Sequence, residues 1–97
     1  MKILAIARVK SETTLATIQP HLVEEVKRAW TLYRDGIVRE MYSCRDRPLG
    51  VVFVLECGTV DEARTHLDAL PFVREQLIDF EIIPLGPFAY FERLFAS

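Results

Sequence analysis

The sequence has too few cysteines for a disulfide framework and no cluster of side chains at metal-ligand spacing. Its two cysteines, Cys44 and Cys57, fall near opposite ends of a predicted hairpin, so we expect no disulfide between them. Its two histidines, His21 and His66, lie in different predicted helices, which predicts that no zinc or iron site is present. Phosphate-binding loops and nucleophile motifs are also missing. We therefore expect a protein that uses neither a metal nor a cofactor.

Long hydrophobic runs and an excess of charge of one sign are missing as well. No apolar run approaches the ~20 residues of a membrane-spanning helix, and the chain opens as a strand rather than as a signal sequence. The net charge is −2, with acids and bases mixed along the chain, so no basic stripe is available to neutralise phosphates. These absences predict a cytoplasmic protein whose partners include neither nucleic acid nor membrane.

What the sequence has in abundance is apolar side chains. They make up 51% of its 97 residues, and the mean hydropathy is +0.16. A chain of this length forms one domain, here residues 1–97, and buries roughly 60–65% of its unfolded surface. The apolar side chains that do not fit into so small a core predict a partner subunit or a ligand cleft.

The pattern of apolar residues predicts a strand, helix, strand, strand, helix and strand. The strands are expected at 2–9, 37–44, 51–57 and 78–82, the last one stopping at Pro84. The first helix should begin near Pro20 and end at Gly36, after a polar connection over 11–18; the second should begin at its N-cap Thr59 and end near Pro71. This order predicts a ferredoxin-like α+β fold, βαββαβ, whose antiparallel sheet carries both helices on one face.

The first predicted helix carries an apolar stripe that we expect to face the core. Leu22, Val26, Ala29 and Tyr33 recur at steps of three and four residues, while Glu24 and Glu25 open the helix. Trp30 and Tyr33 allow two interpretations, because they could be core residues or the wall of a ligand cavity under the helix.

Two regions have no partner within the predicted domain. The helices cover one face of the sheet, and a second copy of the chain packed on the other face would form a homodimer, with higher assemblies left open. An aromatic tail from about residue 87 (PFAYFERLF) carries too much apolar area for a disordered end. It should dock either on the helices of its own subunit or on the neighbouring subunit.

Three stretches of the sequence resemble the dimeric α+β barrel superfamily, and within it the small muconolactone isomerase-like proteins. They are residues 33–37 (YRDGI), 61–63 (DEA), and 67–72 (LDALPF) ahead of 80–85 (FEIIPL). The resemblance implies a dimeric barrel and cofactor-free proton abstraction and return on a small lactone, in a cleft between the sheet and the partner subunit. The chain departs from those isomerases on the first strand, where residues 2–9 contain no histidine.

Charged side chains on the strands are the candidates for such chemistry. Proton transfer beside a carbonyl needs a base of suitable pKa and a group that stabilises the developing negative charge. The catalytic candidates are Glu40 and Tyr42, on one face of the second strand, and Arg8 on the first; the ligand-binding candidates are Trp30, Asp79 and Glu81. In the alternative interpretation the carboxylates point to solvent and Arg8 forms an ion pair with one of them, which contributes little at a surface.

The sequence thus predicts a small-molecule-binding homodimer, with cofactor-free isomerase chemistry resembling that of muconolactone isomerase. The alternative is a non-catalytic dimeric module for binding or assembly. A cofactor-independent monooxygenase of the same superfamily fits less well, because no histidine and asparagine pair lies on the strands.

Overall fold

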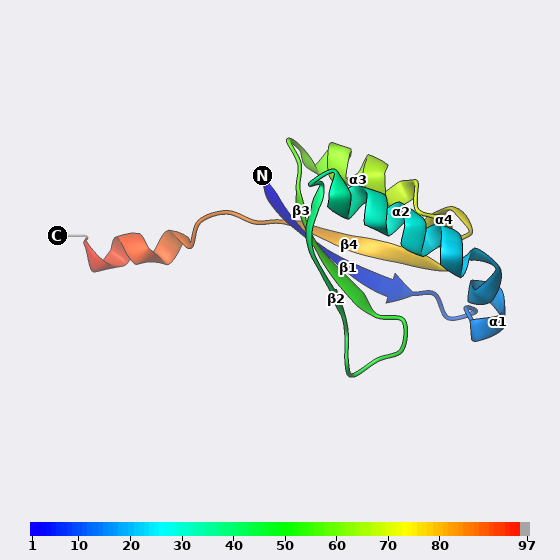
Figure 1. Ribbon diagram of the computed structural model, residues 1–97. Coiled ribbons are helices and arrows are strands. Elements are labelled where there is room, and N and C mark those ends of the chain that lie inside the picture. The colour runs from blue at the N-terminus through cyan, green and yellow to red at the C-terminus, as the bar shows by residue number, and fades with distance from the viewer. Residues whose placement is uncertain (96–97) are drawn as a thin grey trace.

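The computed structural model describes residues 1–95, so the last two residues of the predicted domain lie outside the description. Its sheet has four antiparallel strands in the order β2-β3-β1-β4, which confirms the ferredoxin-like α+β fold (Figure 1). The strands are β1 (Lys2–Val9), β2 (Val38–Ser43), β3 (Val51–Glu56) and β4 (Ile78–Pro84). The helices are α1 (Leu15–Ile18), η1 (Gln19–His21), α2 (Leu22–Arg34), α3 (Val60–Asp68), α4 (Pro71–Arg74) and η2 (Ala89–Leu94).

Strand β1 lies at the centre of the sheet, between β3 and β4, as its two apolar faces require. Ile3, Ala5 and Ala7 are buried on the side of the helices, whereas Leu4 and Ile6 point to the other side and are partly exposed. Figure 1 shows α2, α3 and α4 on the same side of the sheet. The opposite side, the helix-free face, has an apolar centre formed by Leu4, Ile6, Val52, Val54 and Ile83.

Helices α3 and α4 have the boundaries that local chemistry predicts. Thr59 is the N-cap of α3, and its hydroxyl accepts a hydrogen bond of 3.1 Å from the backbone N–H of Glu62. Helix α3 ends at Asp68, and Pro71 opens the short helix α4, where its missing N–H and fixed φ are tolerated. Ala63, Leu67 and Leu70 are buried and belong to the hydrophobic core.

The sequence predicted only a polar connection over residues 11–18. In the structure, the end of this connection forms helix α1. Thr14 and Thr17 build a capping box in which each threonine hydroxyl accepts a hydrogen bond from the backbone N–H of the other residue. This helix places Ile18 in the core with 2% of its surface exposed. Pro20 then lies in η1, and α2 begins at Leu22, two residues later than Pro20.

The predicted burial of the α2 stripe is wrong. Val26, Trp30 and Tyr33 expose 59%, 60% and 48% of their surfaces. The helix ends as predicted, with Gly36 at a φ of 79°, a left-handed conformation that glycine adopts without strain. The stripe is therefore helical but stands clear of the core, which leaves space beneath α2.

The tail does not dock on the helices of its own chain. Figure 1 shows η2 projecting from the end of β4, away from the body, and the whole chain measures 60 × 28 × 20 Å. The side chains of Phe88, Tyr90, Phe91, Leu94 and Phe95 are all more than half exposed. Of the two predicted docking modes, the one on the same subunit is wrong for this chain.

Candidate functional site

The space beneath α2 is a cavity of 570 Å³ between that helix and the sheet, here called the α2 cavity. Its roof is formed by α2, including Leu22, Glu25, Val26, Ala29 and Trp30. Its floor and walls come from β2, the start of β3 and the end of the hairpin loop, with Phe53, Phe72 and Ile78 among the apolar side chains. This volume lies within the range of small-molecule sites.

Glu25 is the one charged residue among those that line the α2 cavity in the described part of the chain. It is 8% exposed, and its carboxylate oxygen Oε1 accepts a hydrogen bond of 2.9 Å from the backbone N–H of Phe72. Burial raises the pKa of Glu25 above its ordinary value of 4.5, against the opposing effects of the Phe72 N–H and the charge of Arg74. A carboxylate with a raised pKa is a stronger base than an exposed one.

The same hydrogen bond gives Glu25 a structural role. Phe72 lies in the first turn of α4, where backbone N–H groups have no partner within the helix, and the N-cap residue Leu70 provides no side-chain bond. Glu25 therefore caps α4 from a position 47 residues earlier in the chain and ties α2 to it. This bond holds the carboxylate in a fixed place at the cavity wall.

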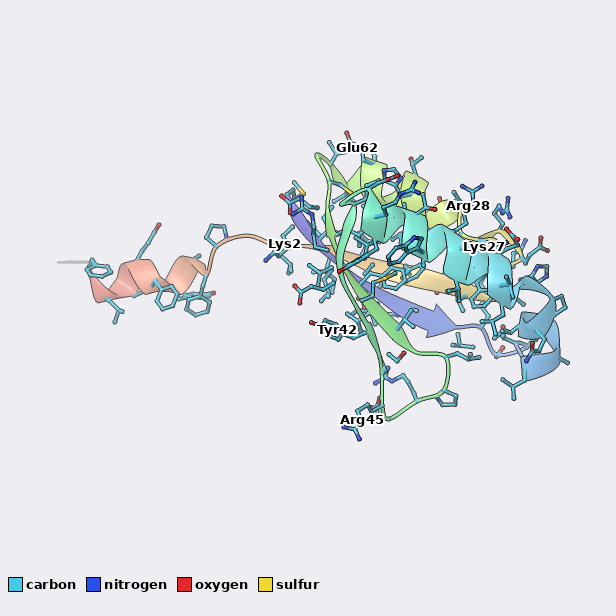
Figure 2. The ribbon with its side chains drawn as sticks, viewed as in Figure 1. Lys2, Lys27, Arg28, Tyr42, Arg45 and Glu62 are labelled. Atoms are coloured by element: carbon cyan, nitrogen blue, oxygen red, sulfur yellow. The ribbon has the colours of Figure 1, made fainter. Side chains whose placement is uncertain are left out.

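The hairpin end contributes a strained residue to the cavity wall. Leu49 has a φ of 61°, a left-handed conformation that costs a non-glycine residue on the order of 1 kcal/mol or more. Its half-buried side chain lines the α2 cavity together with Gly50 and Val51. Arg45 lies at the tip of this hairpin (Figure 2).

The catalytic candidates Glu40 and Tyr42 lie together on the helix-free face. The Tyr42 hydroxyl donates a hydrogen bond of 2.8 Å to Glu40 Oε1, which raises the pKa of Tyr42. Figure 2 shows the Tyr42 side chain projecting from β2 away from the helices, although Tyr42 also borders the α2 cavity. The pair is exposed, and the sheet separates the Glu40 carboxylate from that of Glu25.

Arg8, Asp79 and Glu81 also lie on the helix-free face, on β1 and β4. An Arg8 guanidinium nitrogen is 2.7 Å from Glu81 Oε1, and Asp79 stands opposite Arg8 in the strand register. Arg8 thus forms the surface ion pair that the alternative interpretation predicts. The two partners border an open hollow of 580 Å³ next to the hairpin, which the structure does not connect with Glu40.

Of the six predicted site residues, Trp30 and Tyr42 border the α2 cavity. Sequence reasoning assigned Glu25 only to the charged first turn of a helix and missed its role. The signal was present, since Glu25 follows Leu22 by three residues and precedes Ala29 by four, which places it on the apolar stripe. An acidic residue on such a stripe is a candidate for burial or for a cavity wall.

Of the remaining candidates, all but Cys44 lie outside the α2 cavity. His21 ends η1, and His66 borders a separate hollow of 370 Å³ with Cys57, Glu62 and the N-terminus. Both cysteines are free thiols, and burial raises the pKa of Cys57. Within residues 1–95, no group of three or more histidine, cysteine or carboxylate residues is placed to hold a metal ion. No helix in that range is both long enough and apolar enough to cross a membrane.

Comparison with known proteins gives a likeness of fold. No protein-family model matches the sequence, and no curated protein matches it. Among solved structures, the chain is similar to the 5-chloro-2-hydroxyhydroquinone dehydrochlorinase TftG from Burkholderia phenoliruptrix AC1100, in complex with 2,5-dihydroxybenzoquinone. The TM-score is 0.72 at 12% sequence identity, over 89% of this chain and 94% of that one. This likeness concerns the fold alone, and it agrees with the ferredoxin-like α+β arrangement of the chain.

Proposed function

We propose that this protein binds a small, partly apolar organic molecule in the α2 cavity and transfers a proton on it without a cofactor, as an isomerase does. The observation that carries the proposal is Glu25, a buried carboxylate of raised pKa at the wall of a largely apolar cavity of 570 Å³. Perturbed acids in cavities of this size are characteristic of functional sites.

In the proposed reaction the Glu25 carboxylate accepts a proton from a carbon beside a carbonyl group of the ligand. The protonated carboxyl then returns the proton to another carbon, so that a double bond moves and no atom is gained or lost. Because Oε1 is held by the Phe72 N–H, the other oxygen, Oε2, is the one that takes the proton. The buried apolar walls from Phe53 and Phe72 would exclude water from the developing charge.

The lining of the cavity favours an uncharged ligand. Among the described residues that border it, no lysine, arginine or histidine could balance a ligand carboxylate, and Glu25 would repel one. We therefore propose neutral lactones and quinones that carry no acidic hydroxyl group as the first ligands to test. The second class shares its ring system with the 2,5-dihydroxybenzoquinone that is bound to the structurally similar TftG.

Native mass spectrometry of the protein purified from its own cells is the first test of binding. A bound small molecule would appear as added mass and could then be identified. A protein that carries no added mass and binds no member of a panel of neutral lactones and quinones contradicts the proposal.

Exchange of carbon-bound hydrogen for deuterium tests the chemistry. In deuterated buffer the wild type should speed exchange beside the carbonyl of a bound ligand, and Glu25→Gln should lose ~10²–10⁴-fold of that enhancement. Glutamine keeps an oxygen that can accept the Phe72 N–H bond, so the cap of α4 is retained. The matched control is Glu24→Gln, which changes an exposed carboxylate in the same turn. Equal exchange by both variants would reject Glu25 as the base.

The second candidate function is a non-catalytic dimeric module, and the helix-free face favours it. Its apolar centre is flanked by the Glu40–Tyr42 and Arg8–Glu81 pairs, an arrangement that suits packing against a second copy. Val54→Lys, placed at that centre, should dissociate the proposed homodimer in sedimentation experiments. The predicted role of Glu40, Tyr42 and Arg8 in catalysis is tested separately by Glu40→Gln, which should slow deuterium exchange if that pair takes part.

A further inference from the structure

We propose that Cys44 is a covalent binding residue of the α2 cavity, and that its thiol adds to ligands with a C=C bond conjugated to a carbonyl group, quinones above all. Cys44 follows β2 directly, lines the α2 cavity, and is a half-buried free thiol. This role rests on the α2 cavity as a ligand site, which is part of the proposed function, but not on proton transfer by Glu25.

The hairpin end fixes the position of Cys44 in the cavity wall. Its backbone N–H donates a hydrogen bond of 2.7 Å to the carbonyl oxygen of Gly50, which closes the loop between β2 and β3. A Cβ atom at Gly50 would lie 3.0 Å from the Cβ of Cys44 and 2.6 Å from the Cγ of Arg47. Glycine at this position therefore allows the side chains of Cys44 and Arg47 to approach each other across the backbone.

Arg47 gives the Cys44 thiol a cation as its neighbour. The pKa of Arg47 is raised chiefly by its hydrogen bond to Asp46 and by the charge of that carboxylate, and in smaller part by the charge of a Cys44 thiolate. The last contribution reflects an attraction between the guanidinium group and the sulfur. Reactive cysteines occur in such settings, beside a cation and partly accessible to solvent.

A second polar group faces the same cavity and indicates that a ligand binds there. Glu25 is 8% exposed, and its Oε1 accepts the Phe72 N–H, whereas Oε2 forms no hydrogen bond with the described residues. No side-chain oxygen or nitrogen in residues 1–95 is both fully buried and without a partner, so Oε2 faces the open space of the α2 cavity. A nearly buried carboxylate oxygen needs a polar partner, which a bound molecule can supply.

The addition of Cys44 to a quinone is balanced without any further reagent. The sulfur attacks a ring carbon of the conjugated C=C bond and forms a C–S bond. The electron pair of the C=C bond moves to one carbonyl oxygen, which receives the proton that the thiol has released. The attacked carbon then loses its hydrogen as a proton to the second carbonyl oxygen. The product is a hydroquinone thioether of Cys44, and no outside oxidant or reductant is consumed.

Cys57 provides an internal comparison, because it is the other cysteine of the sequence. It is 8% exposed and borders a separate hollow rather than the α2 cavity. Burial and the charge of Glu62 raise the pKa of Cys57, so less of it is present as the reactive thiolate. We therefore expect Cys57 to react with a quinone more slowly than Cys44.

Reaction with menadione, a methylated naphthoquinone without an acidic hydroxyl group, tests the role of Cys44. Under nitrogen the full chain should gain the mass of one quinone, and peptide mapping should place it on Cys44, with a rate about tenfold or more above that at Cys57. The rate at Cys44 should level off as menadione increases, because the quinone binds in the cavity before it reacts. Iodoacetamide, which needs no cavity, is the control, and its rate should rise linearly.

The variant Cys44→Ser separates covalent addition from binding. It should form no adduct at residue 44 and keep the wild-type circular dichroism. It should still bind menadione reversibly, measured by quenching of Trp30, the one tryptophan of the sequence and a residue that lines the cavity.

Three outcomes overturn the role of Cys44: no adduct on the wild type, equal rates at both cysteines, or a menadione rate that rises linearly without levelling off. If the wild type forms no adduct while Cys44→Ser binds menadione, the covalent role fails and the proposed ligand site stands. If neither protein binds menadione or any neutral lactone, the ligand site fails as well.

Discussion

The helix layer has two halves, α2 and the pair α3 and α4. Both have similar sequence patterns, but they are packed differently. Helix α3 buries Ala63 and Leu67, and the adjacent Leu70 and Phe72 are also inside the core. Helix α2 is longer and equally periodic, yet within the described chain its one buried residue is the acidic Glu25. An apolar stripe shows which face of a helix turns inward, but not whether the neighbouring elements approach closely enough to bury it.

This difference assigns separate tasks to the two halves. The segment from α3 to α4 places Ala63, Leu67, Leu70 and Phe72 in the core, and their burial stabilises the fold. The looser half under α2 provides the cavity, a carboxylate of raised pKa and a strained hairpin residue, features that cost stability and on which the proposed function depends.

Leucine-to-alanine substitutions in the two halves should show the largest contrast. Leu67→Ala empties a site that is 1% exposed and should lower the free energy of unfolding by ~2–5 kcal/mol. Leu22→Ala, at a residue that is 37% exposed beside the cavity, should lower it by about 1 kcal/mol or less. Urea unfolding followed by circular dichroism measures both. Equal losses would show that α2 is packed as tightly as α3.

Removal of the Glu25 carboxylate should loosen the connection between α2 and α4. Glu25→Ala leaves the Phe72 N–H buried without its partner and should destabilise the chain by ~1–3 kcal/mol. Glu24→Ala removes an exposed carboxylate 3.6 Å from Lys27 and should cost under ~0.5 kcal/mol. Hydrogen exchange at the Phe72 amide locates the effect, and unchanged protection there would contradict the cap.

The N-caps of α3 and α1 allow a finer comparison of the two halves. Thr59→Ala should cost about 1 kcal/mol, because the hydroxyl that accepts the Glu62 N–H is lost at the start of a packed helix. Thr14→Ala removes the equivalent bond, 3.3 Å long, from the four-residue α1 and should cost roughly 0.5 kcal/mol. Thermal unfolding of the two variants compares their losses of stability. A larger loss for Thr14→Ala than for Thr59→Ala would contradict the prediction.

The smallest expected effect is a pH dependence at Glu25. Because its pKa is higher in the folded chain than its ordinary 4.5, the folded state favours the protonated carboxyl, and stability is lost as pH rises from 4.5 through the raised value. Glu25→Gln should not show this loss, so its stability relative to wild type should increase over that interval and then level off. Chemical unfolding at a series of pH values tests the sign, with Glu24→Gln as the control for net charge. A stability difference between Glu25→Gln and wild type that does not change with pH would contradict a raised pKa of Glu25.

Local chemistry made much of the architecture predictable from the sequence. Thr59 and Gly36 mark helix ends through their own backbone and side-chain preferences, and the alternation of Ile78, Phe80 and Ile82 defines one face of β4. The short helix α1 was missed because four residues are too few to show a helical period and because its threonine cap resembles a polar loop.

The candidate site was less predictable, because it depends on distances between segments far apart in the chain. Glu40 and Tyr42 were expected on one strand face and are hydrogen-bonded there, but the buried carboxylate of Glu25 meets its partner Phe72 across 47 residues. Whether a polar residue on an apolar stripe is exposed, buried or at a cavity wall is decided by the neighbours that tertiary packing brings to it.

The sequence by itself thus determined the order of strands and helices, the two faces of the sheet and the apolar character of the tail, because these follow from periods of two and 3.6 residues and from turn chemistry. Only the tertiary structure decided that α2 leaves a cavity between itself and the sheet, that Glu25 lines this cavity and that the tail leaves from the opposite end. The physical reason is that burial and pKa depend on packing distances, which no local pattern contains.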